Sequence, residues 1–199
     1  MMQPVILASG STIRRQMLEN AGLTVEVRPA RVDEEAIKSA MLAEEAPPRD
    51  IADKLAELKS QRVSMRSGRT LVIGADQVLV CDGRLYDKPR DLEEAWAHLA
   101  RLRGRVHELI SAAVICEEGR PVWRHIGRAQ LMMRPFSDGF LDAYLEEEGE
   151  AALHAVGYYR LEGPGAQLFS RVQGDYFSVL GLPLLEVLGF LRARGILIE

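Results

Sequence analysis

The sequence has few cysteines, few aromatic residues and no large excess of charge of either sign. Only two of its 199 residues are cysteine, and aromatic residues make up 6% of the chain. Cys81 and Cys116 stand alone, without a CxxC spacing or a neighbouring His cluster. Neither a disulfide framework nor a structural zinc site is therefore indicated, and isolated thiols suit a reducing cytoplasm, where we expect the protein to be located.

Long apolar runs and a basic character are also lacking. The apolar run at residues 5–8 is too short for a signal peptide or a membrane span, and no later segment approaches the required length. The formal net charge is −4, which argues against a general nucleic-acid or membrane surface role. We therefore expect no nucleic-acid partner and no association with a membrane.

What the sequence does contain is an ordinary globular composition, with 47% hydrophobic residues. This is enough for one substantial core or two closely joined lobes. Apolar patterns predict strands at residues 5–8, 25–27, 71–80, 106–116, 122–133 and 166–172, and helices after Ser11, Asp33, Asp50, Asp91 and Ser137 or Asp138 and over 184–191. Strands outnumber simple strand-helix-strand repeats, and no linker marks a boundary. We therefore expect a mixed α/β sheet rather than a fully parallel one, in a single domain over residues 1–199.

The first predicted strand breaks at Ser9-Gly10-Ser11 into a helix that carries Arg14 and Arg15 near its start. Cations are unfavourable there, because the first turn has unpaired backbone N–H groups and a partial positive charge. A phosphate group bound at this turn would explain both arginines. The alternative is that both side chains point to solvent.

Three further charged residues lie at unusual positions. Lys59 interrupts a mostly apolar helix face, unless its stem lies along the core edge and its ammonium reaches water. Asp76 lies inside an apolar strand, where a carboxylate must be paired, metal-bound or hydrogen-bonded to backbone amides at a bulge. Lys88 is held in a short connection between a hairpin and a helix, unless it is a solvated loop lysine. By contrast, the run 146–148 of three glutamates is interpreted as the solvated end of a helix.

Several spaced motifs occur in one order over nearly the whole chain. They are Leu7-Ala8-Ser9-Gly10-Ser11, Arg14-Arg15, Val32-Asp33-Glu34, Leu55-Ala56 with Lys59, Gly74-Ala75-Asp76-Gln77-Val78, Asp82-Gly83 with Lys88-Pro89, Glu162-Gly163, and Gly174-Asp175-Tyr176 with Gly181-Leu182-Pro183. In this order they resemble the Maf family, whose members cleave nucleoside triphosphates to a monophosphate and pyrophosphate. The resemblance implies a mixed twisted sheet in two lobes with a central cleft, similar to the inosine triphosphatase house-cleaning enzymes.

The resemblance also implies roles for individual residues. Asp76 would accept a proton from the attacking water, and Glu34 and Asp76 would hold a divalent metal cation, Mg²⁺ or Mn²⁺. The catalytic residues would be Asp76, Lys59 and Lys88, and the substrate-binding residues would be Ser9, Ser11, Ile13, Arg14, Arg15, Gln77 and Glu162. The expected partner is a small-molecule nucleoside triphosphate, and we also expect a homodimer.

The base that is bound stays open. Two residues resemble the branch of the family that hydrolyses 7-methyl-GTP, whose base is cationic. They are Gln77 and Glu162, and at the position of Glu162 the thymidine and uridine triphosphatase branch has Gln. Three residues depart from the family pattern. Ile13 lies where the 7-methyl-GTP branch has Trp, Asp87 lies where a Gly precedes Lys-Pro, and Ala155 lies where a Lys is common. Two other functions remain as alternatives: a general nucleotide phosphatase, and a regulator of septum formation that binds nucleotides without turning them over.

Overall fold

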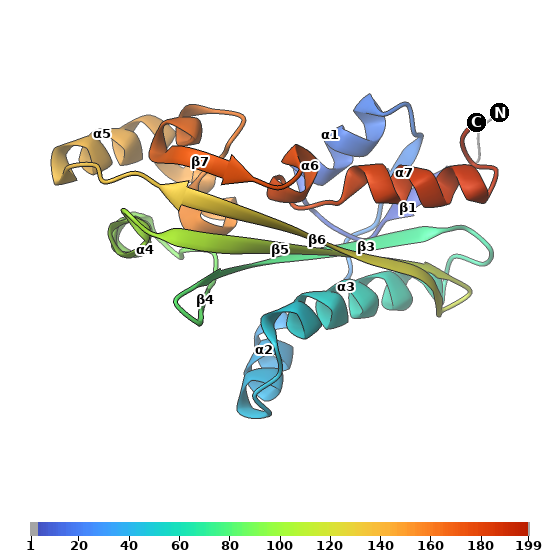
Figure 1. Ribbon diagram of the computed structural model, residues 1–199. Helices are drawn as coiled ribbons and strands as arrows, with labels where there is room; N and C mark the ends of the chain where they lie inside the picture. Colours follow the sequence, from blue (N-terminus) through green and yellow to red (C-terminus); the bar gives the residue numbers. More distant parts are fainter. Residues whose placement is uncertain (1–3, 199) are drawn as a thin grey trace.

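Seven strands form one mixed sheet in the computed structural model, which describes residues 4–198 (Figure 1). The strands are β1 (Val5–Leu7), β2 (Val25–Val27), β3 (Val72–Cys81), β4 (Arg84–Tyr86), β5 (Val106–Glu117), β6 (Arg120–Met133) and β7 (Phe169–Gln173). The strand order is β2-β1-β3-β5-β6-β7, and β4 pairs with β3. Strand β1 runs parallel to β2 and β3, and the other pairs are antiparallel. The predicted mixed α/β fold is therefore confirmed.

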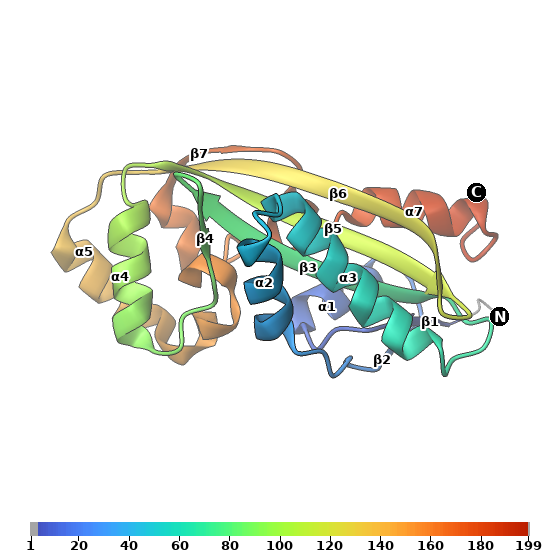
Figure 2. The same ribbon diagram turned by 90° about the horizontal axis from the view of Figure 1, so that it is seen from below.

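Helices cover both faces and one end of this sheet. They are α1 (Thr12–Asn20), α2 (Glu34–Ala43), α3 (Pro48–Ser64), α4 (Leu92–Leu102), α5 (Asp138–Glu148), α6 (Tyr176–Val179) and α7 (Leu184–Ala193), with 3₁₀ segments η1 (Gly149–His154), η2 (Val156–Tyr158) and η3 (Pro164–Leu168). Helix α3 lies along one face and α1 and α7 on the other, while α4 and α5 lie at the far end (Figures 1 and 2). Within residues 4–198, no helix is both long and apolar enough to cross a membrane.

The three largest apolar clusters of the described residues divide the molecule into two lobes that share the long strands. The first lobe has a cluster beneath α3, which includes Leu55 and Val78, and a second beneath α1 and α7, which includes Leu18 and Ile73. The second lobe is centred on α4, α5 and the 3₁₀ segments, and its cluster includes Leu99. Because alternate residues of a strand point to opposite faces, β3 contributes side chains to more than one cluster.

Gly74 allows α3 to lie unusually close to β3. A Cβ atom at this position would lie 2.2 Å from the Ala56 carbonyl oxygen and 2.7 Å from the Ser60 backbone nitrogen. Any other residue would therefore push the helix away from the strand. The close approach places the middle of α3, where Lys59 lies, directly over β3.

The structure confirms several predicted helix starts and corrects one. Ser11, Asp91 and Ser137 are N-caps, and each side chain accepts a hydrogen bond from a backbone N–H in the first turn. The prediction that Asp50 caps the third helix is wrong, because α3 begins at Pro48 and Asp50 lies inside its first turn. Proline suits the first helical position, since its missing N–H would have no partner there.

Two other predictions are corrected in the second lobe. The strand predicted over 166–172 begins only at Phe169, because residues 164–168 form η3. Glu148 is not solvated: its side chain is 0% exposed, and its Oε2 accepts a hydrogen bond of 2.8 Å from Nε of Arg160. The chain continues directly from α5 into η1, so the helix end is covered instead of facing water.

Candidate active site

A buried lysine and a buried aspartate form an ion pair at the centre of the site. The Lys59 ammonium lies 2.6 Å from Oδ1 of Asp76 and 2.9 Å from Oε1 of Glu34. Lys59 and Asp76 are only 7% and 5% exposed. The ammonium therefore does not extend to water along the core edge, and Asp76 is held by a lysine instead of backbone amides at a bulge.

The local sequence explains how these three side chains meet. Asp76 points from β3 toward α3, which lies close because of Gly74. Glu34 is the first residue of α2. Asp33 fixes the start of this helix, because Oδ1 of Asp33 accepts a hydrogen bond of 3.0 Å from the Ala36 N–H. An acidic residue in the first turn is also favoured by the helix dipole.

Arg14 reaches into the protein and links three separate segments. Its Nε donates to the Gly181 carbonyl at 2.8 Å, and its Nη1 donates to the Ala75 carbonyl at 2.9 Å and to Ser9 Oγ at 3.2 Å. Burial lowers the pKa of Arg14 from its ordinary value, and the charges of Asp76 and Glu34 oppose this shift. The alternative that Arg14 points to solvent is therefore excluded.

Lys88 lies close enough to this group to respond to its charges. Lys88 is exposed in the loop after β4. Its pKa is lowered by desolvation and by the positive charges of Arg14 and Lys59, while Glu34 and Asp76 act in the opposite direction. The structure thus brings together five of the predicted residues. We call Arg14, Glu34, Lys59, Asp76 and Lys88 the charged cluster.

The charged cluster has the composition of a site for a polyanion. Three cations face two carboxylates, so an anionic ligand would be attracted. Its most distinctive atom is Oδ2 of Asp76, which is buried and has no hydrogen-bond partner among the described residues. A buried carboxylate oxygen without a partner is costly, so this atom is suited to bind a water molecule or a cation.

Comparisons with known proteins identify the family of the chain. Residues 4–194 match the sequence model of a family described as Maf-like protein. The chain belongs to the Maf family. A protein of Ruegeria pomeroyi named nucleoside triphosphate pyrophosphatase is 52% identical over 98% of each chain. A protein of the same name from Caulobacter vibrioides is 53% identical over 98% of this chain and 97% of its own.

Among solved structures, the chain is similar to a protein of Mycobacterium abscessus described as a nucleoside-triphosphatase and dITP/XTP pyrophosphatase. The TM-score is 0.35 with 19% sequence identity, over 66% of this chain and 73% of that chain.

In this Maf-family chain, the remaining predicted residues near α1 divide into two groups. Ser9 and Ser11 support the first turn: Ser9 Oγ accepts from the Ser11 N–H at 3.2 Å, and Ser11 Oγ accepts from the Arg14 N–H at 3.4 Å. Arg15 and Ile13 are not brought into the charged cluster. Arg15 is 45% exposed and lies 3.7 Å from Glu19, and Ile13 packs partly against the apolar cluster of the first lobe.

Gln77 and Glu162 also lie apart from the charged cluster. Gln77 follows Asp76 on β3 and therefore points to the opposite face of the sheet. Its Nε2 donates to Ser111 Oγ and to the carbonyls of Ser178 and Val179, which ties α6 to the sheet. Glu162 is exposed in the turn that precedes η3. In the described part of the chain, neither side chain forms a hydrogen bond or an ion pair with the side chain of Asp76 or Lys59.

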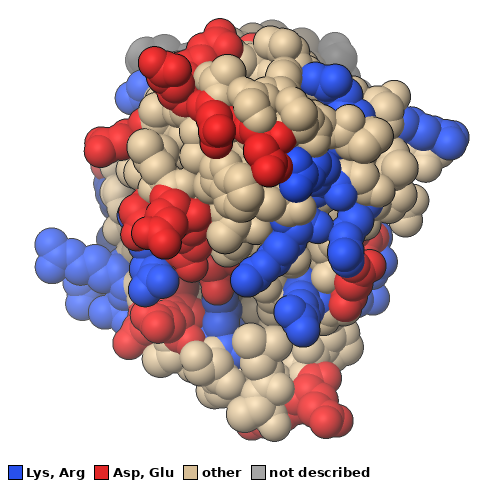
Figure 3. Space-filling model, turned by 90° about the vertical axis from the view of Figure 1, so that its left-hand side faces the viewer, with Lys and Arg blue, Asp and Glu red and all other residues tan. Residues whose placement is uncertain are grey.

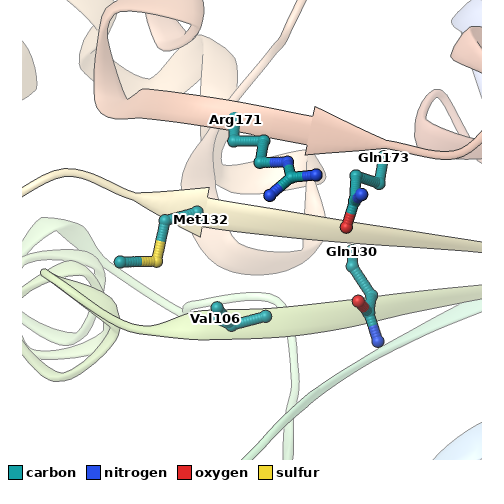
Figure 4. A pocket seen from close by; sticks show the side chains of 5 residues that line it. All are labelled: Val106, Gln130, Met132, Arg171 and Gln173. Carbon is teal, nitrogen blue, oxygen red and sulfur yellow. The ribbon is translucent and has the colours of Figure 1, made fainter.

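One surface pocket away from the charged cluster shows different chemistry. A pocket of about 270 Å³ on β5, β6 and β7 is lined by Val106, Gln130, Met132, Arg171 and Gln173 (Figure 4). It contains one cation and no carboxylate. On the face at the second-lobe end of the molecule, acidic and basic side chains both occur in patches, and neither sign covers the face (Figure 3).

Sequence reasoning missed residues that act through backbone atoms or over long distances. The Gly181 carbonyl anchors Arg14, and a Cβ at this position, where φ is +99°, would approach the guanidinium within 3.2 Å. The Gly-Leu-Pro motif marked this segment, but nothing in it indicated a contact with α1. Lys38 and Asp87 were likewise not recognised as partners.

Proposed function

We propose that this Maf-family protein hydrolyses nucleoside triphosphates to nucleoside monophosphate and pyrophosphate. The observation that carries the proposal is the buried Lys59–Asp76 pair, in which Asp76 keeps one oxygen without a partner among residues 4–198. The names of the similar proteins from Ruegeria and Caulobacter support the same reaction.

The cations of the charged cluster account for binding of the triphosphate. Arg14, Lys59 and Lys88 come from α1, α3 and the loop after β4, and the charges of Arg14 and Lys59 both act on Lys88. The N-terminus of α1 adds backbone N–H groups and the positive end of the helix dipole. Together these groups neutralise the phosphate oxygens, which is the main requirement for phosphoryl transfer.

Asp76 accounts for activation of water. Lys59 donates to Oδ1 and holds the carboxylate in one orientation, which leaves Oδ2 to accept a proton from the water. The water oxygen then forms a bond to the α-phosphorus, and the bond from the α-phosphorus to the bridging oxygen breaks. Pyrophosphate leaves with that oxygen and its electron pair, and the cations stabilise the charge.

The residues also fit a divalent cation such as Mg²⁺ or Mn²⁺. Among residues 4–198 there is no group of three or more His, Cys, Asp or Glu side chains that could hold a metal alone. Mg²⁺ often binds through one or two carboxylates together with substrate phosphates, and Asp76 Oδ2 and the Glu34 carboxylate would supply these. When bound, the cation would neutralise charge on the phosphate oxygens.

We extend the proposal to modified nucleotides such as 7-methyl-GTP, which would make the protein a house-cleaning enzyme of the cytoplasm. The support is the carboxylate of Glu162, which is exposed in the turn before η3 and would favour a cationic base beside it. Asp76 Oδ2 favours turnover over a regulator that only binds nucleotides, since a binding module does not require a desolvated carboxylate beside the phosphates.

The test is a panel of normal and modified nucleoside triphosphates, including 7-methyl-GTP and UTP, assayed for release of pyrophosphate and of phosphate. Asp76→Asn should keep the fold and lower the rate by about 10²–10⁴-fold, because it removes the base. Asp142→Asn is the matched control, since Asp142 accepts a hydrogen bond from Trp96 on the surface of the second lobe. Release of phosphate alone, or an Asp76→Asn rate within a few-fold of wild type, would contradict the proposal.

The divalent cation is tested separately: a chelator should stop the release of pyrophosphate.

A further inference from the structure

A second ion pair connects α2 to the loop that carries Lys88. The Lys38 ammonium lies 2.6 Å from Oδ1 of Asp87, and the two side chains are 23% and 70% exposed. Lys38 belongs to α2, and Asp87 directly follows β4. The pair therefore joins two segments that are 49 residues apart in the chain.

Each partner of this ion pair lies near a residue of the charged cluster in the sequence. Lys38 lies four residues after Glu34, so both side chains leave the same face of α2 one turn apart. Glu34 contacts Lys59, while Lys38 contacts Asp87. Asp87 in turn immediately precedes Lys88 in the sequence.

The loop is fixed on the other side of Lys88 by Pro89, which is buried. The Lys88 backbone is thus held between a buried proline and the Lys38–Asp87 pair. Helix α2 has no fully buried residue of its own. Its apolar contacts with the cluster beneath α3 come from Ile37 and Met41, which are partly buried, and its ion pairs with Lys59 and Asp87 add to these contacts.

We propose that Lys38 and Asp87 are positioning residues that hold Lys88 toward the triphosphate. The proposal rests on the function proposed above, because it assigns Lys88 to the phosphates. Neither Lys38 nor Asp87 touches the reacting atoms. Their pair fixes the backbone directly before Lys88, whose charge interacts with those of Arg14 and Lys59.

The state of Lys38 agrees with this arrangement. Burial disfavours its charged form, but the hydrogen bond to Asp87 and the carboxylates of Asp87, Asp76 and Glu34 outweigh burial, so the pKa of Lys38 is raised. Lys38 therefore stays charged and paired. Without the pair, the Lys88 loop would have to be ordered by the ligand, and this ordering would weaken triphosphate binding.

The experiment compares Asp87→Asn, Lys38→Met and the double variant with wild type. Each single variant should raise KM for the triphosphate about fivefold, the upper range for a partly exposed ion pair, with kcat within about twofold. The double variant should be no worse than either single one, because both remove the same interaction. Lys38→Arg keeps the positive charge opposite Asp87, so its KM should equal that of wild type.

Asp138→Asn is the matched control. The Arg103–Asp138 pair has the same length of 2.6 Å and similar exposures of 28% and 66%, but lies in the second lobe. Its loss should leave KM unchanged. An Asp87→Asn KM equal to that of Asp138→Asn, or single effects that multiply in the double variant, would overturn the proposal.

A failure of the proposed function would be recognised separately. If wild type releases no pyrophosphate from any triphosphate in the panel, that function is wrong. The same variants would then be compared by their Kd for α,β-imido analogues of the triphosphates, and an unchanged Kd in Lys38→Met and Asp87→Asn would overturn the positioning role.

Discussion

Replacing Gly74 by alanine tests how the fold creates the Lys59–Asp76 pair. The added Cβ would lie 2.2 Å from the Ala56 carbonyl oxygen, whereas ordinary contact begins at 3.4 Å. Because this neighbour is backbone and not a flexible side chain, α3 itself has to move away from β3, by about 1 Å. Lys59 moves with the helix, while Asp76 stays on the strand.

This displacement should have two measurable consequences. Overpacking of this kind destabilises a protein by about 1–3 kcal/mol, which corresponds to a fall of about 2–12 °C in Tm for a chain of this size. A misplacement of about 1 Å in a site can reduce the rate about 10²-fold. We expect kcat for pyrophosphate release to fall by this factor at temperatures where the variant is still folded.

Gly189→Ala is the matched control. Gly189 lies inside α7, and a Cβ there would meet no atom within 4 Å. Alanine should therefore stabilise the helix by about 0.5–1 kcal/mol and leave the rate unchanged. A Gly74→Ala protein with the Tm and kcat of wild type would refute the idea that close packing of α3 on β3 positions Lys59.

Three further predictions concern other parts of the molecule. Arg14→Ala should raise KM for the triphosphate about tenfold or more and also lower Tm, because the Gly181 and Ala75 carbonyls lose a charged donor; an unchanged KM would mean that Arg14 only supports the fold. Glu162→Gln should lower kcat/KM for 7-methyl-GTP relative to UTP by about tenfold, through loss of a charge-assisted hydrogen bond worth about 1.5–3 kcal/mol; an unchanged ratio would show that Glu162 does not face the base. Burial lowers the pKa of His107 from 6.5 to about 4, so between these pH values the unfolded chain binds a proton that the folded chain does not. Stability should therefore fall by about 3 kcal/mol as pH drops from 6.5 to 4, and His107→Phe should flatten this part of the denaturation profile; an identical slope in the variant would contradict the assignment.

The sheet and most helices could be predicted because their signals are local. Asp91 and Ser137 cap helices through bonds to residues only three positions away, and the apolar run of β3 reflects burial on both faces. The 3₁₀ segments and the short helix α6 are too short for a periodic pattern. Asp175 caps α6 locally, and the contacts of Gln77 fix this helix against the sheet.

The candidate site was predictable where a residue type conflicts with its surroundings. A carboxylate in an apolar strand, a lysine on an apolar helix face and an arginine in a first helical turn each need a partner, and the structure brings Asp76, Lys59 and Arg14 together. Gln77 shows the limit of motif reasoning. Alternation along a strand already places it on the opposite face from Asp76, so proximity in the sequence did not imply proximity in the site.

Contacts between distant segments decide the remaining features, and nothing local encodes them. Arg14 and Gly181 are 167 residues apart, and the acceptor is a backbone carbonyl that every residue type has. Glu148 looks like its two solvated neighbours in the sequence, yet it alone is turned inward to meet Arg160. A buried charge is tolerated only when its partner is in place, so the same glutamate would be exposed if the chain after α5 did not fold back over it. The composition of that run therefore carries no information about which glutamate is buried, and only the path of the following segment does.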